Sequence, residues 1–210
     1  MKQIRDRARD SFPSVLLTLL SIVQAIALET LWEASRHRTD LFDMSWLSMI
    51  SWLQLAATLF GIIFIWLSYV GLVMRFRITP ELGDLIIPFF VGLFEFLLIE
   101  MTSPGRLGEW FVVLAVTAAV VTFFTHKLFQ RARRDPANHV FFSVIQPATW
   151  RDHAERLLPA ALSALAGIWL WESGHTGWIA FLAILLVWLS LFYQIWISTK
   201  WWRISMGDDC

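Results

Sequence analysis

The sequence has little charge and almost no cysteine, and each shortage excludes a class of protein. Only 16% of its 210 residues are charged and 57% are hydrophobic, whereas an ordinary soluble domain carries about a quarter charged residues. Its 17 basic and 17 acidic residues leave no net charge, so the basic field that nucleic-acid binding needs is missing. The single cysteine, Cys210, excludes an intrachain disulfide framework, a thiolate zinc site and a Cys-x-x-Cys redox pair.

The aromatic residues are abundant, and nearly all of them are Trp or Phe. The chain contains 13 Trp and 17 Phe beside only 2 Tyr. Such a composition is typical of a surface that lies in hydrocarbon and at the headgroup boundary. We therefore predict an integral membrane protein whose main partner is the lipid bilayer, with no nucleic-acid partner.

Apolar stretches long enough to cross a bilayer recur along the chain. About 20 apolar residues in a helix span the bilayer core, and six stretches come close to this length, at residues 13–31, 46–74, 85–101, 110–129, 158–173 and 178–198. The sequence predicts a single all-α transmembrane domain with six helices and a cytoplasmic interfacial segment at residues 131–157. Although the first stretch contains an Ala-x-Ala cleavage pattern, we expect it to be retained as a helix.

Basic residues divide unequally between the two sides of this arrangement. Fourteen Lys and Arg residues fall on the side of the N-terminus and three on the other side. Cytoplasmic loops carry the excess of Lys and Arg. We therefore predict that both termini are cytoplasmic and that the protein lies in the plasma membrane, which would be the inner membrane in a bacterium.

The six helices group by pattern into three similar hairpins. Predicted helices one, three and five start near a proline (Pro13, Pro88, Pro159), and helices two, four and six align on a tryptophan (Trp52, Trp110, Trp178). Small residues follow on one face of the second helix of each pair, and polar residues come deeper on that face. An internal repeat of one hairpin would produce this shared pattern. The alternative is that small residues and hydroxyls are enriched at membrane-helix interfaces in general.

The first helix carries a polar stripe. Ser14, Thr18, Ser21, Ala25 and Glu29 lie within an arc of about 80° at 100° per residue. We expect this stripe to face protein or water. Leu16, Leu20 and Val23 would then face lipid.

Glu95 is the most informative ionisable residue. It lies five residues before Glu100 in an apolar helix, and a charge inside a membrane is rare and usually functional. A carboxyl in this setting could carry or release a proton. The alternative is a structural hydrogen bond to a neighbour such as Gln24, which lies the same five residues before Glu29.

Three glutamates, Glu29, Glu100 and Glu172, end the odd-numbered helices on the predicted outer side. A ring of acids at a pore entrance would concentrate cations. The alternative is that charged residues collect where helix ends meet water.

The remaining candidates argue against catalysis and cofactors. His126 ends the polar face of the fourth helix, but no two histidines have the i, i+3 or i, i+4 spacing of a helical metal pair. Phosphate-binding, dinucleotide-binding and serine-hydrolase signatures are absent. We predict no metal, no cofactor and no enzymatic activity.

One segment resembles a known family. Residues 66–77, Trp-Leu-Ser-Tyr-Val-Gly-Leu-Val-Met-Arg-Phe-Arg, followed by a Pro-Glu-Leu-Gly-Asp turn and an apolar helix, resemble the small bacterial six-helix potassium-channel subunits related to the lysosomal potassium channel. Helix number, cytoplasmic termini and length are also similar. That family's selectivity depends on a Phe-Ser-Asp motif, and the matching place here reads Phe12-Pro13-Ser14, so the resemblance implies a layout and transfers no pore residue.

Two functions follow as hypotheses. The first is a homo-oligomeric channel or small transporter for cations or protons, in which Glu95, Gln24, Ser21, His126 and the outer glutamates contribute to a polar path. The alternative is a non-transporting sensor or anchor subunit that works with a cytoplasmic protein partner. Arg131, Arg133 and Arg134 would contact that partner or lipid headgroups.

Overall fold

The computed structural model describes residues 2–174 and 177–206, and this part of the chain is helical without any strand. Its α-helices are α1 (Lys2–Arg36), α2 (Trp46–Arg75), α3 (Ile87–Glu100), α4 (Leu107–Arg134), α5 (His139–Val144), α6 (Trp150–Ser173) and α7 (Trp178–Met206). Short 3-10 helices connect them: η1 (Thr39–Phe42), η2 (Leu82–Leu85), η3 (Pro104–Arg106) and η4 (Pro136–Asn138).

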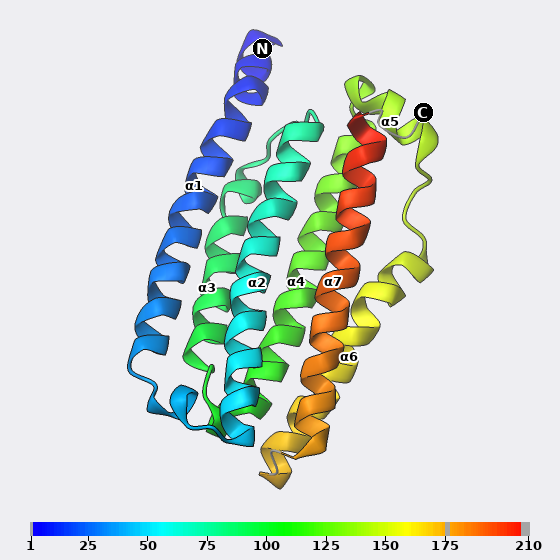
Figure 1. Cartoon of the computed structure of the whole chain (residues 1–210). Coiled ribbons are helices and arrows are strands. Elements are labelled where there is room, and N and C mark those ends of the chain that lie inside the picture. The colour runs from blue at the N-terminus through cyan, green and yellow to red at the C-terminus, as the bar shows by residue number, and fades with distance from the viewer. Residues whose placement is uncertain (1, 175–176, 207–210) are drawn as a thin grey trace.

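The long helices lie side by side as one bundle, as Figure 1 shows. Helices α1 to α4 and α7 run roughly parallel to one axis, whereas α6 runs obliquely across one side. α1 begins and α7 ends at the same end of the bundle, beside α5 (Figure 1). We call this the N-terminal end and the other the distal end.

Local sequence signals set several helix boundaries. The Ser45 side chain accepts a hydrogen bond of 3.1 Å from the Ser48 backbone N–H and so caps the start of α2. Pro88 lies in the first turn of α3, where its missing N–H is not needed. Gly174 ends α6 with a φ of 65°, a left-handed conformation that favours glycine.

Two large clusters of buried apolar side chains hold the bundle together. One lies toward the N-terminal end around Leu16, Leu20 and Leu128, and the other lies toward the distal end around Trp110 and Phe111. Trp110 is fully buried, and its Nε1 donates a 3.0 Å hydrogen bond to Thr58 Oγ1. Trp110 lies near the distal start of α4, and its indole points into the bundle.

Helices α4 and α6 approach each other most closely at two glycines. A Cβ on Gly108 would lie 2.7 Å from the Gly167 carbonyl oxygen, and a Cβ on Gly167 would lie 2.7 Å from the Gly108 carbonyl oxygen. The backbones can therefore touch only because both side chains are absent.

Within the described residues, four helices are long and apolar enough to cross a membrane, over Arg7–Arg36, Trp46–Arg75, Leu107–Arg134 and Trp178–Met206. Five of the six apolar stretches lie within a helix, and the remaining one, residues 85–101, contains α3 and extends beyond it at both ends. However, α3 has only 14 residues, and the first turns of α6 carry Arg151, Asp152 and Glu155. The all-helical fold is thus confirmed, and a count of six membrane-spanning helices stays a prediction.

Several boundaries differ from those predicted. α1 starts at Lys2 and α6 at Trp150, so Pro13 and Pro159 lie inside helices, and only Pro88 of the three prolines marks a helix start. Residues 131–157 are also not one interfacial segment: α4 continues to Arg134, and α6 takes residues 150–157. Charged residues continue these helices because Arg, Lys and Glu favour a helix in water.

Candidate functional site

Glu95 lies at the centre of the candidate site. Its side chain is 0% exposed, and the Gln24 Nε2 donates to both carboxylate oxygens, at 2.8 and 3.0 Å. The contact joins α1 to α3, as the equal spacing of both residues from the outer glutamates suggested. The Gln24 Oε1 is itself buried and has no hydrogen-bond partner in the described part of the chain.

The polar stripe of α1 faces away from the bundle. Ser14, Thr18, Ser21, Ala25 and Glu29 are all exposed, and a shallow groove runs along the first four of them. Our prediction for the opposite face was wrong, because Leu16, Leu20 and Val23 are buried against α2 and α3. The hydrophobic face is the one that has partners within the chain, and it therefore turns inward.

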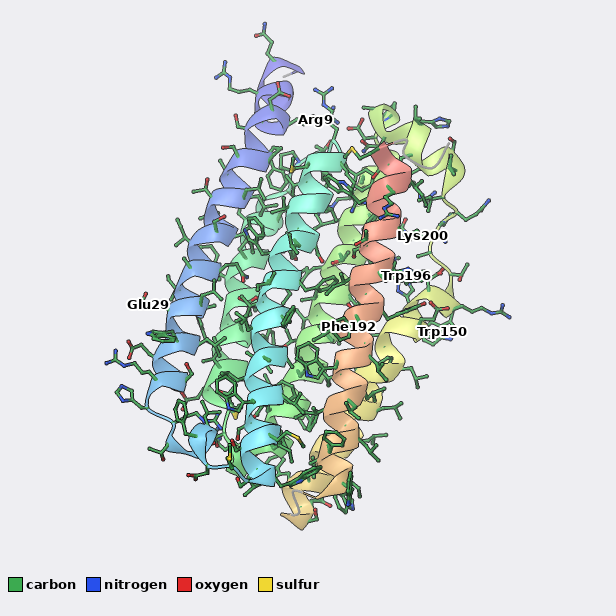
Figure 2. The ribbon with its side chains drawn as sticks, in the orientation of Figure 1. Arg9, Glu29, Trp150, Phe192, Trp196 and Lys200 are labelled. Carbon is green, nitrogen blue, oxygen red and sulfur yellow. The ribbon has the colours of Figure 1, made fainter. Side chains whose placement is uncertain are left out.

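The stripe has few bonding partners inside the protomer. The Thr18 hydroxyl donates to the Ser14 carbonyl oxygen at 2.9 Å, within the same helix. The Trp66 Nε1 approaches Ser21 Oγ at 3.4 Å. Figure 2 shows Glu29 at the end of the stripe, pointing away from the bundle.

The three outer glutamates are all exposed. Glu100 and Glu172 lie at the distal ends of α3 and α6, but the prediction that Glu29 ends the first helix was wrong, because α1 continues to Arg36. Glu100 forms an ion pair of 3.6 Å with Arg106. Glu29 and Glu172 belong to α1 and α6, helices that lie on different sides of the bundle (Figure 1). A ring of these acids would therefore require several copies of the chain.

His126 is half-buried on α4, and its ring meets that of His153 on α6 with a centroid distance of 4.6 Å. The two residues are 27 positions apart, so helical spacing within the sequence could not indicate this pair. Across the described residues, no three His, Cys, Asp or Glu side chains converge in a way that could hold a metal ion.

The three arginines after residue 130 differ in their surroundings. Arg131 donates to both carboxylate oxygens of Asp84 and lies 3.2 Å from Glu81. Arg133 donates to the Ile145 carbonyl oxygen and stacks over the Phe142 ring, which fastens α5 to the end of α4. Arg134 is exposed. Of the three, Arg134 is the one whose side chain is most accessible to a partner.

Two buried residues that the sequence did not single out belong to the same region. Tyr69 of α2 is 3% exposed, and Asp84 of η2 is also 3% exposed. Tyr69 is one of two tyrosines in a chain rich in Phe and Trp, a contrast that could have drawn attention to its hydroxyl. Nothing in the sequence places Asp84 beside Arg131, 47 positions away.

A second polar cluster closes the distal end. Arg38 forms an ion pair of 2.6 Å with Asp40 and donates to the Thr102 carbonyl oxygen, and Ser51 Oγ donates to Asp40 at 3.0 Å. The hydrogen bond from Arg38 holds the pKa of Asp40 below its ordinary value of 3.8, and the bond from Ser51 acts in the same direction. These contacts tie the connection between α1 and α2 to the end of α3.

The fold and the site together define a class: an all-helical bundle with four apolar helices of membrane-crossing length and a buried Gln24–Glu95 pair between two helices. No known protein family, curated protein or solved structure matches the chain. Function is therefore argued from the chain's own residues.

Proposed function

We propose that the protein is a subunit of a homo-oligomeric membrane channel or small transporter for protons or other small cations. The observation that carries this proposal is the full burial of Glu95 within an apolar helix, with one amide as its hydrogen-bond partner. Ionisable residues at such positions in membranes are expensive to bury and mark ion and proton pathways.

The membrane arrangement belongs to the same proposal. In it, α3 and α6 cross the bilayer together with the four longer helices, and both termini face the cytoplasm of a plasma membrane. The excess of Lys and Arg at the N-terminal end supports this orientation, and so does the position of the start of α1 and the end of α7 at one end of the bundle (Figure 1).

The exposed stripe of α1 supports homo-oligomerisation. In a single protomer its hydroxyls and Glu29 would face lipid, which offers them no hydrogen bonds. A second copy packed along α1, or water held between copies, supplies partners for these groups. The stripe would then line a path between subunits, and the outer glutamates of several copies would stand around its entrance.

Flux measurements on proteoliposomes test the proposal. Purified protein in vesicles should pass protons or potassium ions under an imposed gradient, at rates well above those of empty vesicles. Glu95→Gln should lower this flux at least tenfold, whereas Asp10→Asn, which alters an exposed residue at the N-terminal end, should leave it unchanged. Flux equal to that of empty vesicles would contradict the proposal.

The alternative is a non-transporting subunit that works with a cytoplasmic partner. The internal contacts of Arg131 and Arg133 mean that neutralising all three arginines would disturb the fold. Arg134→Gln is the informative change, and loss of a co-purifying soluble protein in this variant would favour the alternative.

A further inference from the structure

Tyr69 presents a buried hydroxyl that has no partner. The residue is 3% exposed, and its Oη makes no hydrogen bond to any group in the described part of the chain. Buried hydroxyls in native proteins are nearly always hydrogen-bonded, either to protein or to ordered water. Phe would fill the same space in this apolar cluster, so the hydroxyl itself needs an explanation.

The position of the Tyr69 hydroxyl indicates an explanation. Tyr69 packs in one cluster with Leu20 and Val91, which lie one helical turn before Gln24 and Glu95, and with Ile87, which lies three residues after Asp84. Asp84 belongs to η2 at the N-terminal end, and Glu95 lies eight residues into α3, about 12 Å along the helix at 1.5 Å per residue. Tyr69 therefore lies between a carboxylate at the end of the bundle and a carboxylate in its interior.

A second unpartnered oxygen lies at the inner end of this line. Gln24 uses its Nε2 to bind Glu95, while its Oε1 is buried without a partner in the described residues. A water molecule in a protein interior typically makes about three hydrogen bonds to such groups. The Gln24 Oε1 and the adjacent Glu95 carboxylate supply acceptors for such a water at the inner end of the line, and the Tyr69 hydroxyl supplies a donor from α2.

We propose that water joins Asp84, Tyr69 and Glu95 into a proton path that opens at the N-terminal end of the bundle and ends at the Glu95 carboxylate. This inference rests on the proposed transport function and narrows it. The proton is the ion that enters from this side, and Tyr69 relays it.

The relay balances without any co-reactant except water. A hydronium ion at the Asp84 end gives a proton to the Tyr69 oxygen, and the O–H bond of Tyr69 breaks toward the water beside Glu95. That water then protonates the carboxylate. Tyr69 is neutral before and after, and the net change is one hydronium ion converted to water and one carboxylate converted to carboxylic acid.

Charged and polar groups from each neighbouring element face this line. Gln24 comes from α1, Asp84 from η2, Glu81 from the N-cap position before η2, and Arg131 from α4. Arg131 binds both Asp84 and Glu81 and so fixes two carboxylates at the entrance of this line.

The packing around Tyr69 selects the proton over metal cations. The cluster that encloses its ring includes Leu20 and Val91, both 0% exposed, and Ile65. These side chains offer no oxygen ligands to replace the hydration shell of potassium or sodium. A proton needs only a chain of hydrogen bonds, which one hydroxyl and a few waters can form.

Tyr69→Phe tests the path because it removes one oxygen and keeps the ring. In proteoliposomes with an enclosed pH-sensitive dye, this variant should take up protons at least tenfold more slowly than the wild type. Tyr193→Phe is the matched control, since its exposed hydroxyl binds Glu155, and it should retain wild-type uptake. The unfolding temperature of Tyr69→Phe should stay near that of the wild type, because the hydroxyl has no protein partner.

The outcomes separate this inference from the function on which it rests. If Glu95→Gln abolishes proton uptake and Tyr69→Phe does not, the path is wrong and the transport function stands. If even the wild type passes no protons, infrared spectra recorded after transfer to D₂O still test whether the path reaches Glu95. Slower hydrogen–deuterium exchange at the Glu95 carboxyl in Tyr69→Phe would support the path, and unchanged exchange would overturn it.

Discussion

At the residue scale, the contact that bears most on the proposed function is the hydrogen bonding of the Gln24 Nε2 to both carboxylate oxygens of Glu95. It links two helices through the interior, where both side chains are buried. Leaving one partner of a buried pair without the other is unfavourable, because the remaining group keeps its desolvation penalty.

We therefore expect Gln24→Leu to lower the free energy of unfolding by about 2 kcal/mol. The double variant Gln24→Leu/Glu95→Leu should recover part of this loss, because it leaves no unpaired carboxylate. Unfolding titrations in detergent micelles measure both. Gln194→Leu is the control, since its amide donates to Ser190 on its own helix and so does not join two helices through this bond. Equal stability of Gln24→Leu and the wild type would show that the pair contributes nothing.

Asp40 gives a residue-scale prediction about pH. Because its pKa in the folded protein lies below the ordinary 3.8, the ionised carboxylate stabilises the fold at any pH above 3.8. This contribution is lost as the pH falls through the lowered value. The unfolding temperature of the wild type should therefore exceed that of Asp40→Asn above pH 3.8, and the difference should shrink at lower pH. The exposed neighbour Asp43 supplies the control, Asp43→Asn. A difference that is the same at pH 3 and pH 7 would contradict this assignment.

At the element scale, the crossing of α4 and α6 depends on Gly108 and Gly167. A methyl group at Gly108 would lie 2.7 Å from the Gly167 oxygen and from the Trp171 backbone nitrogen, and neither backbone atom can move aside without its helix. Gly108→Ala should destabilise the protein by about 2 kcal/mol. Gly61→Ala in α2, where a Cβ meets nothing within 4 Å, should be neutral or stabilising by up to about 1 kcal/mol. Equal stabilities in the same unfolding assay would mean that the two helices separate freely.

The elements also reveal which features a sequence can predict. Each apolar stretch became a helix, because burial of the backbone in an apolar run requires internal hydrogen bonding. The Gln24–Glu95 contact could be predicted because both residues lie at the same depth in adjacent helices. The boundaries of α1 and α6 could not be predicted, because charged residues such as Arg151 and Asp152 extend a helix without any hydrophobic signal.

The hydropathy pattern of the sequence does not predict contacts between elements that are distant along the chain. The burial of Leu16 and Leu20 depends on which neighbours α1 meets, and hydropathy cannot separate a lipid-facing leucine from one that faces protein. Asp84–Arg131 and His126–His153 join positions with no periodic relation. Such pairs depend on how the helices cross, and a single sequence does not contain that geometry.

At the scale of the whole molecule, one outer face of the bundle departs from the apolar surface expected of a membrane protein. Large apolar side chains cover much of its outside, as expected in lipid, yet one outer face carries the hydroxyls of α1 and Glu29. In a lipid environment this face is the one surface whose polar groups gain most from a neighbouring copy. The proposed association along α1 would give these hydroxyls and Glu29 the hydrogen-bond partners that lipid does not offer.

Disulfide cross-linking examines that association directly. In a Cys210→Ser background, Ser21→Cys should form a covalent dimer under mild oxidation in native membranes, because symmetric copies bring equivalent positions on the stripe together. Leu189→Cys is the matched control: Leu189 is 67% exposed on α7 and should stay monomeric, since its face is apolar and suited to lipid. Thr18→Cys and Ala25→Cys should cross-link with Ser21→Cys, following the helical period. Equal cross-linking at residues 21 and 189 would indicate random collision, and the stripe would then face lipid in a monomeric protein.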